Sequence, residues 1–175
     1  MIGVGDLAAY LLTAANAIYP QSNHSYMEPK AITQARYEQF AKDIAQVVLD
    51  PQVKPIFAGE DGRVKTGLLL VVLARYESSF RNDVMTCTKL GDNGRAFGTY
   101  QSHRSPDTVC QGNIQAAWIA IEMIRESFQV CHNFPMSYRL AEYTDGNNLN
   151  TSRAFKRSSD RIDTAMNYYS HHNIK

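Results

Sequence analysis

The chain has 175 residues, the size of one typical domain, and about 70% of the surface of an unfolded chain of this length becomes buried on folding. Its 18 Lys and Arg residues against 17 Asp and Glu residues give a formal net charge of +1, which argues against a dedicated nucleic-acid-binding protein with a basic excess. Hydrophobic residues make up 44% of the chain and charged residues 20%, as in a globular domain, and three cysteines are too few for a disulfide-dense scaffold.

The apolar stretches of the sequence are short. The most apolar run, residues 67–74, is eight residues long, whereas a membrane-spanning helix needs about 20, so we expect no insertion into a membrane. The N-terminal segment is also apolar, but it lacks the basic start of a secretory signal peptide and contains Asp6, Thr13 and Asn16. We therefore interpret it as the first helix of the fold.

The first half of the chain is predicted to form three helices. Asp6 can cap the first, which runs towards Tyr19, and the second begins at Pro29 and ends before Pro51. Residues 64–76 are almost wholly apolar, a composition that fits a buried strand or a buried helix. The length of this segment and the scarcity of strand patterns near it favour a buried helix.

The second half begins with residues 81–112, which are polar and contain glycine, and we interpret them as a long functional loop. Helices are then expected over 113–130 and 135–143, and a final helix to about residue 170 is expected to be capped by Thr151 or Ser152. The expected core-facing residues of the helix over 113–130 are Ile114, Ala117, Ile121, Ile124 and Phe128. Trp118 falls among them and is expected to pack in the core. The sequence contains no repeat or linker, so we predict a single, mostly α domain over residues 1–175.

Glu77 is the most informative polar residue, because it ends the apolar segment in the run ARYESSF. A carboxyl group there leaves the core at the end of a buried helix. Partial burial favours the protonated form of a carboxyl group, as a general acid requires. Taken alone, a glutamate at a helix end is more often simply solvated, and the sequence of this segment by itself favours that interpretation.

Two further segments contain chemistry-bearing residues. In GDNGRAFGTYQ (Gly91–Gln101), three glycines indicate a tight turn or a close approach, and Asp92 lies among them; an ordinary Asp turn is the alternative. The segment is neither a phosphate loop nor a dinucleotide fingerprint, because the lysine and the strand-to-helix context are missing. In AEYTDG (Ala141–Gly146), Tyr143 precedes a glycine turn, and a packed tyrosine is the alternative there.

Taken in order, these three segments resemble the lysozyme-like superfamily, in particular the goose-type lysozymes and the soluble lytic transglycosylases. The resemblance is clear over residues 70–104 and weaker over 138–147. It implies a lysozyme-like fold whose buried central helix ends at a catalytic glutamate, here Glu77. The positions that match the goose-type glycine segment are Gly91, Asp92, Gly94, Phe97, Gly98 and Gln101. Tyr143 and Gly146 match the transglycosylase turn, with Thr144 where an Asn is usual.

One departure from the goose-type pattern concerns the residues that position water. These enzymes tend to have a second acidic residue two positions after the matching Gln, and this chain has His103 there. Asp92 is therefore the matched candidate for positioning water, and His103 is either a substrate contact or a surface histidine. The residues that the resemblance implies as sugar contacts are Tyr100, Gln101 and Tyr143, with Tyr76 behind them.

The substrate that the resemblance implies is the glycan strand of bacterial peptidoglycan, cut between N-acetylmuramic acid and N-acetylglucosamine. Glu77 would protonate the glycosidic oxygen, and in an inverting hydrolase Asp92 would activate water from about 6.5 to 9.5 Å away. In a lytic transglycosylase the muramic acid C6 hydroxyl attacks instead and gives a 1,6-anhydro product. Asp92 favours hydrolysis and His103 weakens that preference. A non-catalytic glycan-binding phage structural protein is a third possibility.

The three cysteines show no spacing that is typical of a metal site or of a catalytic thiol. Cys87, Cys110 and Cys131 are 23 and 21 residues apart, which is no zinc pattern, and no signature joins them to a histidine, so we expect no metal and no cofactor. A disulfide between Cys87 and Cys110 would brace the loop that contains Asp92; three reduced cysteines are the alternative.

The substrate that the resemblance implies lies outside the cytoplasm, and the N-terminal segment does not look like a signal peptide. The protein would therefore have to reach the peptidoglycan by another route. We expect the protein to act in the periplasm or cell wall of a target bacterium, delivered either as a phage lysin or as a type VI secretion effector. An effector would have a cognate immunity protein that occupies its cleft.

Overall fold

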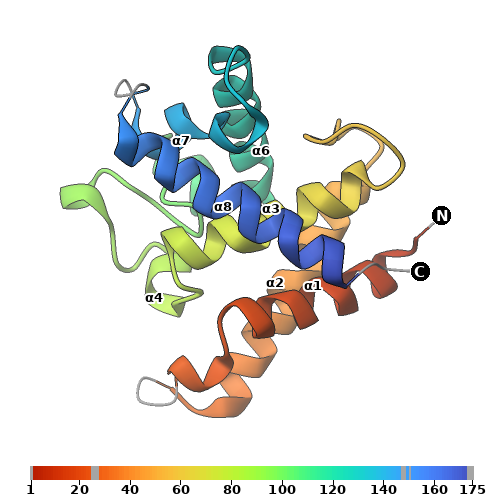
Figure 1. The fold of residues 1–175 in the computed structure, drawn as a ribbon. Coiled ribbons are helices and arrows are strands. Elements are labelled where there is room, and N and C mark those ends of the chain that lie inside the picture. The colour runs from red at the N-terminus through yellow and green to blue at the C-terminus, as the bar shows by residue number, and fades with distance from the viewer. Residues whose placement is uncertain (1, 25–27, 147–148, 150, 173–175) are drawn as a thin grey trace.

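The computed structural model describes residues 2–24, 28–146, 149 and 151–172. Within these ranges the chain forms eight α-helices, three short 3-10 helices and no β-strand, which confirms the predicted mostly α class (Figure 1). The helices are α1 (Val4–Ile18), η1 (Gln21–His24), α2 (Lys30–Leu49), α3 (Gly62–Glu77), α4 (Asn82–Met85), η2 (Asp92–Gly94), α5 (Pro106–Val109), α6 (Asn113–Val130), η3 (Met136–Tyr138), α7 (Ala141–Asp145) and α8 (Ser152–His171).

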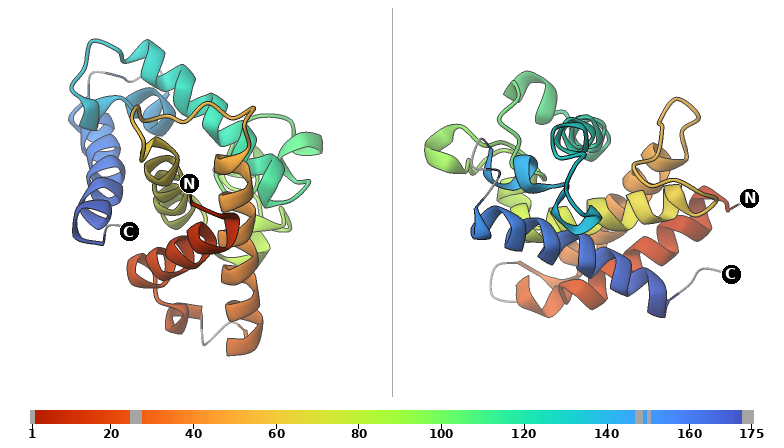
Figure 2. Two further views of the ribbon diagram at one scale, coloured as in Figure 1. Left: turned by 90° about the vertical axis from the view of Figure 1, so that its right-hand side faces the viewer. Right: turned by 45° about the horizontal axis from the view of Figure 1, so that its top comes forward.

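Helix α3 lies at the centre of the structure, as the apolar run predicted. Every residue from Leu68 to Ala74 is fully buried, and α1, α2 and α8 pack around it (Figure 2). Burying each large aliphatic side chain contributes about 1.5–3 kcal/mol, so this helix is a main source of stability. Its last residue is Glu77, after which Ser79 and Phe80 adopt positive φ values of 51° and 52° and turn the chain away.

The starts of α1 and α2 differ slightly from the expected ones. Asp6 was expected to cap α1, but Gly3 is the N-cap residue and Asp6 lies in the first turn. The Asp6 carboxylate is still close to the helix start, because a Cβ on Gly3 would lie 3.3 Å from its Oδ2 atom. Pro29 has an extended conformation (φ −60°, ψ 141°), so α2 begins one residue later than predicted, at Lys30.

The second half departs further from the predicted elements. The expected loop over 81–112 contains three short helices, and the helix expected over 135–143 is broken into η3 and α7. The break is at Leu140, whose amide donates to Ser158 Oγ (2.9 Å) instead of continuing a helix. Ile114 was expected in the core but is 43% exposed, because it lies in the first turn of α6, ahead of the turns that pack. Trp118 packs against the core as expected.

Helix α8 crosses over α3 (Figure 1). The predicted cap is confirmed, because Thr151 Oγ1 accepts a hydrogen bond from the Ala154 amide (3.0 Å). Its buried residues are Ala154, Ser158, Arg161, Ile162 and Ala165, a stripe at helical spacing that contains one arginine. Among the described residues, no helix has the length and apolar character that crossing a bilayer requires.

Candidate active site

A cleft of about 870 Å³ opens where α3 ends. Its walls come from the end of α3, the glycine segment (Gly91–Gln101) with His103 and Arg104 after it, and parts of α6, α7 and α8. Of the residues singled out from the sequence, the cleft brings together Glu77, Asp92, Gln101, His103 and Tyr143. Residues as distant in sequence as Glu77 and Tyr143 thus share one cavity, which is of the size that small-molecule sites have.

The Glu77 carboxylate is bound by an arginine that the sequence analysis missed. Arg161 of α8 donates from Nη2 (2.7 Å) and Nε (3.2 Å), and both bonds go to Oε1 of Glu77. The Arg161 side chain is 9% exposed and that of Glu77 is 20% exposed. A sequence signal for Arg161 did exist, since it falls within the buried stripe of α8 where a charged residue needs a partner.

The glycine segment contains two close approaches at which an added side chain would force a neighbouring side chain to move. A Cβ on Gly91 would lie 1.8 Å from Oε1 of Gln101, and one on Gly98 would lie 2.9 Å from Cγ1 of Val109, at a φ of 68°. Two short antiparallel bridges, Gly91 with Ala96 and Phe97 with Ser102, fold the segment on itself. The close approaches that the three glycines predicted are therefore present at Gly91 and Gly98, where the lack of a side chain leaves room for them.

Gln101 lines the cleft but is engaged within the segment, because its Nε2 donates to the Gly98 carbonyl (3.0 Å). Asp92 lies at the rim with a φ of 44°, and its Oδ2 is 3.4 Å from Nε2 of His103 and 3.2 Å from Nη2 of Arg95. His103 thus lies against the carboxylate that was proposed to position water. The contact is exposed to solvent, since the His103 side chain is 64% exposed.

The two tyrosines expected to contact a sugar differ in position. Tyr100 is only 2% exposed and does not line the cleft, so the structure does not bring it together with the other expected sugar contacts. Tyr143 does line it, with its hydroxyl donating to the Tyr100 carbonyl (3.3 Å) and its amide to Ser127 Oγ (3.0 Å). Burial, together with the negative charge of Glu77, raises the pKa of Tyr143 well above 10.0, so its phenol is neutral.

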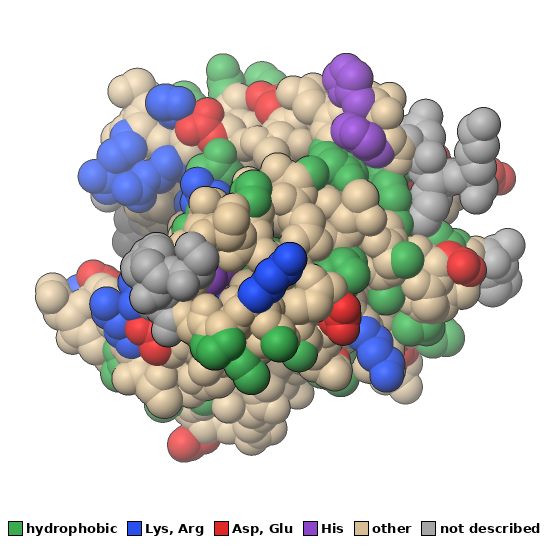
Figure 3. Space-filling model, turned by 90° about the horizontal axis from the view of Figure 1, so that it is seen from below, with side chains coloured by type: hydrophobic (Ala, Val, Ile, Leu, Met, Phe, Trp, Pro, Cys, Tyr) green, Lys and Arg blue, Asp and Glu red, His purple; other side chains and the backbone are tan. Residues whose placement is uncertain are grey.

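Several charged groups on the remaining walls are paired, including Arg104 with Glu126. Asp145, whose side chain is 4% exposed, binds Arg153 (2.6 Å) and Arg157 (3.1 Å), and hydrogen bonds from Arg153 lower the pKa of Asp145. Burial and the charge of Glu126 raise the pKa of Glu142. The cleft lining is therefore polar with mixed charges, which suits a ligand rich in hydroxyl and amide groups. Acidic and basic side chains are also interspersed over the face of the molecule seen from below in Figure 3.

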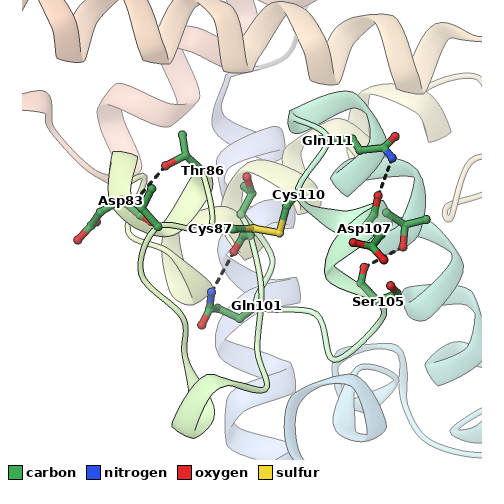
Figure 4. The surroundings of a disulfide bond; sticks show 12 residues. Asp83, Thr86, Cys87, Gln101, Ser105, Asp107, Cys110 and Gln111 are labelled. Carbon is green, nitrogen blue, oxygen red and sulfur yellow. Dashed lines mark hydrogen bonds between the residues drawn. A yellow bond between two sulfur atoms is a disulfide. The ribbon is translucent and has the colours of Figure 1, made fainter.

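A disulfide braces the wall that contains Asp92. Cys87 and Cys110 form a disulfide (S–S 2.03 Å), which is one of the two alternatives that the sequence left open (Figure 4). Cys131 is a buried free thiol. The bridge closes residues 87–110 into a loop, and a Cβ on Gly98 would lie 3.7 Å from Cys87 Sγ. The disulfide is therefore packed directly against the glycine segment.

No protein-family model, curated protein or solved structure matches the chain. Within the part of the chain that the structure describes, no group of three or more His, Cys, Asp or Glu residues is arranged to hold a metal ion. A function therefore has to be argued from the residues that line the cleft and from the order of the motifs that supply them.

Proposed function

We propose that the protein is a lysozyme-like muramidase that cuts peptidoglycan glycan strands between N-acetylmuramic acid and N-acetylglucosamine. The observation that carries this proposal is Glu77, a carboxyl group at the end of a buried helix that reaches a cleft also lined by Asp92. The order of α3, the glycine segment and the 141–146 turn around that cleft fits a lysozyme-like fold. The reaction would take place in the wall of a target bacterium.

Glu77 would act as the general acid. As the glycosidic bond breaks, its proton passes to the leaving oxygen, and the sugar ring passes through an oxocarbenium-like transition state. Asp92 would then orient a water molecule for attack on the anomeric carbon, with the adjacent His103 available to receive the water proton. The product would be a strand with a reducing-end muramic acid.

The polar walls of the cleft support a glycan as the substrate. N-acetylated sugars present hydroxyl and amide groups without charge at each ring, and the side chains at the cleft offer both donors and acceptors. The neutral phenol of Tyr143 and the amide of Gln101 are of the types that contact sugars. The Tyr143 hydroxyl would have to keep or exchange its bond to the Tyr100 carbonyl when a sugar binds.

A lytic transglycosylase is the second candidate. The specific observation in its favour is that Oδ2 of Asp92 already contacts His103 and Arg95, so this oxygen is less free to hold water. In that reaction Glu77 first donates its proton to the leaving oxygen and then takes the proton of the muramic acid C6 hydroxyl as it attacks the anomeric carbon. No water is consumed, and the product is a 1,6-anhydro sugar.

A digest of purified peptidoglycan, with the products identified by mass spectrometry, tests the proposal. Wild type, Glu77→Gln and the control Glu60→Gln, which changes an exposed glutamate outside the cleft, would be compared. We expect reducing-end muramic acid from wild type and from Glu60→Gln, and no cleavage by Glu77→Gln. Anhydro products, lighter by one water, would establish the transglycosylase instead. Intact glycan after treatment with folded wild type would overturn both and leave a glycan-binding protein.

A further inference from the structure

Arg161 is held in place from three directions. Its Nη1 donates to the Arg157 carbonyl one turn earlier in α8 (2.9 Å), and its guanidinium lies over the ring of Tyr76, 4.6 Å from the centroid. The third contact is the pair of hydrogen bonds to Glu77 described above. With 8% of the residue exposed, the guanidinium has little freedom to leave this position.

The bonds between Arg161 and Glu77 distinguish the two carboxyl oxygens. Both end on Oε1, and Oε2 accepts no hydrogen bond from the described residues. Glu77 itself lines the cleft, whereas Arg161 does not. A guanidinium cannot release a proton near neutral pH, so Oε1 must remain an acceptor and a proton on this carboxyl group has to be on Oε2.

We propose that Arg161 is the positioning residue of Glu77: it fixes Oε1 and leaves Oε2 to transfer the proton in the cleft. This inference rests on the proposed function. When the Oε2–H bond breaks, the proton goes to the leaving glycosidic oxygen and the electron pair stays on the carboxylate. The negative charge that forms there is stabilised by a fixed cation, which costs no reorganisation during the reaction. Arg161 touches neither substrate nor reacting atoms, and it acts through Glu77.

The groups that face Glu77 differ in charge. Arg161 faces it from α8 as a cation, and Tyr143 faces it from α7 as a neutral phenol. Arg161 is therefore the cation that stabilises the carboxylate formed when the proton leaves. Removing it should lower kcat with little change in KM, and the conservative lysine should restore part of the loss, a pattern that loss of stability alone would not produce.

The experiment compares Arg161→Met, Arg161→Lys and a matched control, Arg36→Lys. Arg36 forms another nearly buried pair with a glutamate, Glu28, outside the cleft. For Arg161→Met we expect kcat for glycan cleavage to fall about 100-fold with little change in KM. Arg161→Lys should recover kcat only in part, because an ammonium keeps the charge but lacks the planar fork. Arg36→Lys should lower the thermal midpoint and leave kcat and KM unchanged.

The outcomes separate this inference from the proposed function. Arg161→Met with wild-type kcat would overturn the inference alone, as would equal losses of kcat in Arg161→Lys and Arg36→Lys. If Arg161→Met does not fold, Arg161→Lys decides by kcat and KM. An active wild type together with an equally active Glu77→Gln would overturn the proposed function, and the positioning role with it.

Discussion

Two arginine–glutamate pairs among the described residues are nearly buried, Arg36–Glu28 and Arg161–Glu77, and their carboxylates are bound to different extents. The side chains are 9% and 15% exposed in the first pair and 9% and 20% exposed in the second. In Glu28 both oxygens are bound by Arg36, and Oε1 also accepts from Thr33 (2.9 Å). In Glu77 a single oxygen accepts both bonds from its arginine.

The difference indicates separate roles for two chemically similar pairs. Arg36 also donates from Nε to the Phe80 carbonyl (2.9 Å), so this pair ties α2 to the chain beyond α3, and none of Arg36, Glu28 and Phe80 lines the cleft. A carboxylate whose two oxygens both accept hydrogen bonds within the protein is a structural brace, because neither oxygen is left without a partner. The half-bound carboxylate of Glu77 keeps one oxygen for the cleft.

The comparison is tested most strongly by removing each carboxylate charge in turn. Glu28→Gln leaves a buried guanidinium without its partner, and we expect a loss of about 3–5 kcal/mol in the free energy of unfolding. Glu77→Gln should cost clearly less, because Glu77 is more exposed and makes fewer hydrogen bonds. Urea unfolding of both variants measures the two losses. A larger loss for Glu77→Gln would contradict the assignment of Glu28 as the structural brace.

Removing the disulfide is expected to give the next largest loss in the free energy of unfolding. Unlike the Arg36–Glu28 pair, the disulfide lies beside the cleft. In the loop-entropy description, closing a loop of this size contributes about 3 kcal/mol to stability. We expect the double substitution Cys87→Ser and Cys110→Ser to lower the free energy of unfolding by about that amount and to reduce glycan cleavage further, because the bridge braces the segment that contains Asp92.

The matched control for this prediction is Cys131→Ala, which changes the buried thiol that is not in the disulfide. Adding a reducing agent should destabilise wild type and Cys131→Ala but leave the double variant unchanged. If the double variant folds and cleaves glycan at the wild-type rate, the glycine segment keeps its conformation without the disulfide, and the prediction is contradicted.

The Arg36–Glu28 pair also predicts a pH dependence of stability. Hydrogen bonds from Arg36 hold the pKa of Glu28 below its ordinary value of 4.5. Because the folded-state pKa is the lower one, the stability that this pair contributes is present above about pH 4.5 and is lost as the pH falls through the folded-state pKa. Glu28→Gln has no such carboxyl group, so the stability difference from wild type should shrink towards acid pH. Urea unfolding at about pH 6 and about pH 3 checks this; a constant difference would contradict it.

The sequence predicted most of what local patterns determine. The apolar run gave α3 and placed Glu77 at its end, threonine capped α8, and the spacing of Cys87 and Cys110 suggested the bridge. These features depend on residues close in the chain or on a simple period. The glycine segment also belongs to this class, since its glycines signal the close approaches that the structure contains.

The parts that could not be predicted depend on contacts between distant segments. Arg161 and Glu77 are 84 residues apart, and only the packing of α8 on α3 brings them together. The burial of Tyr100 depends on the way that residues 97–102 fold back, where no alternating strand pattern tells which side chains face inward. Leu140 breaks a helix because Ser158, from α8, offers its amide a different acceptor.

The smallest change in stability is expected for an exposed ion pair on α8, the helix that also contains Arg161. This pair shows how little such a pair contributes when water surrounds it. Lys156 Nζ lies 2.9 Å from Oδ2 of Asp160, but the two side chains are 75% and 39% exposed. Water screens such a pair and the long side chain loses freedom in forming it, so we expect Lys156→Met to change the thermal midpoint by less than about 1 °C. A shift as large as that of Arg36→Lys would mean that burial is not what separates these pairs. The contrast between Glu28 and Glu77 would then have to rest on hydrogen-bond geometry alone.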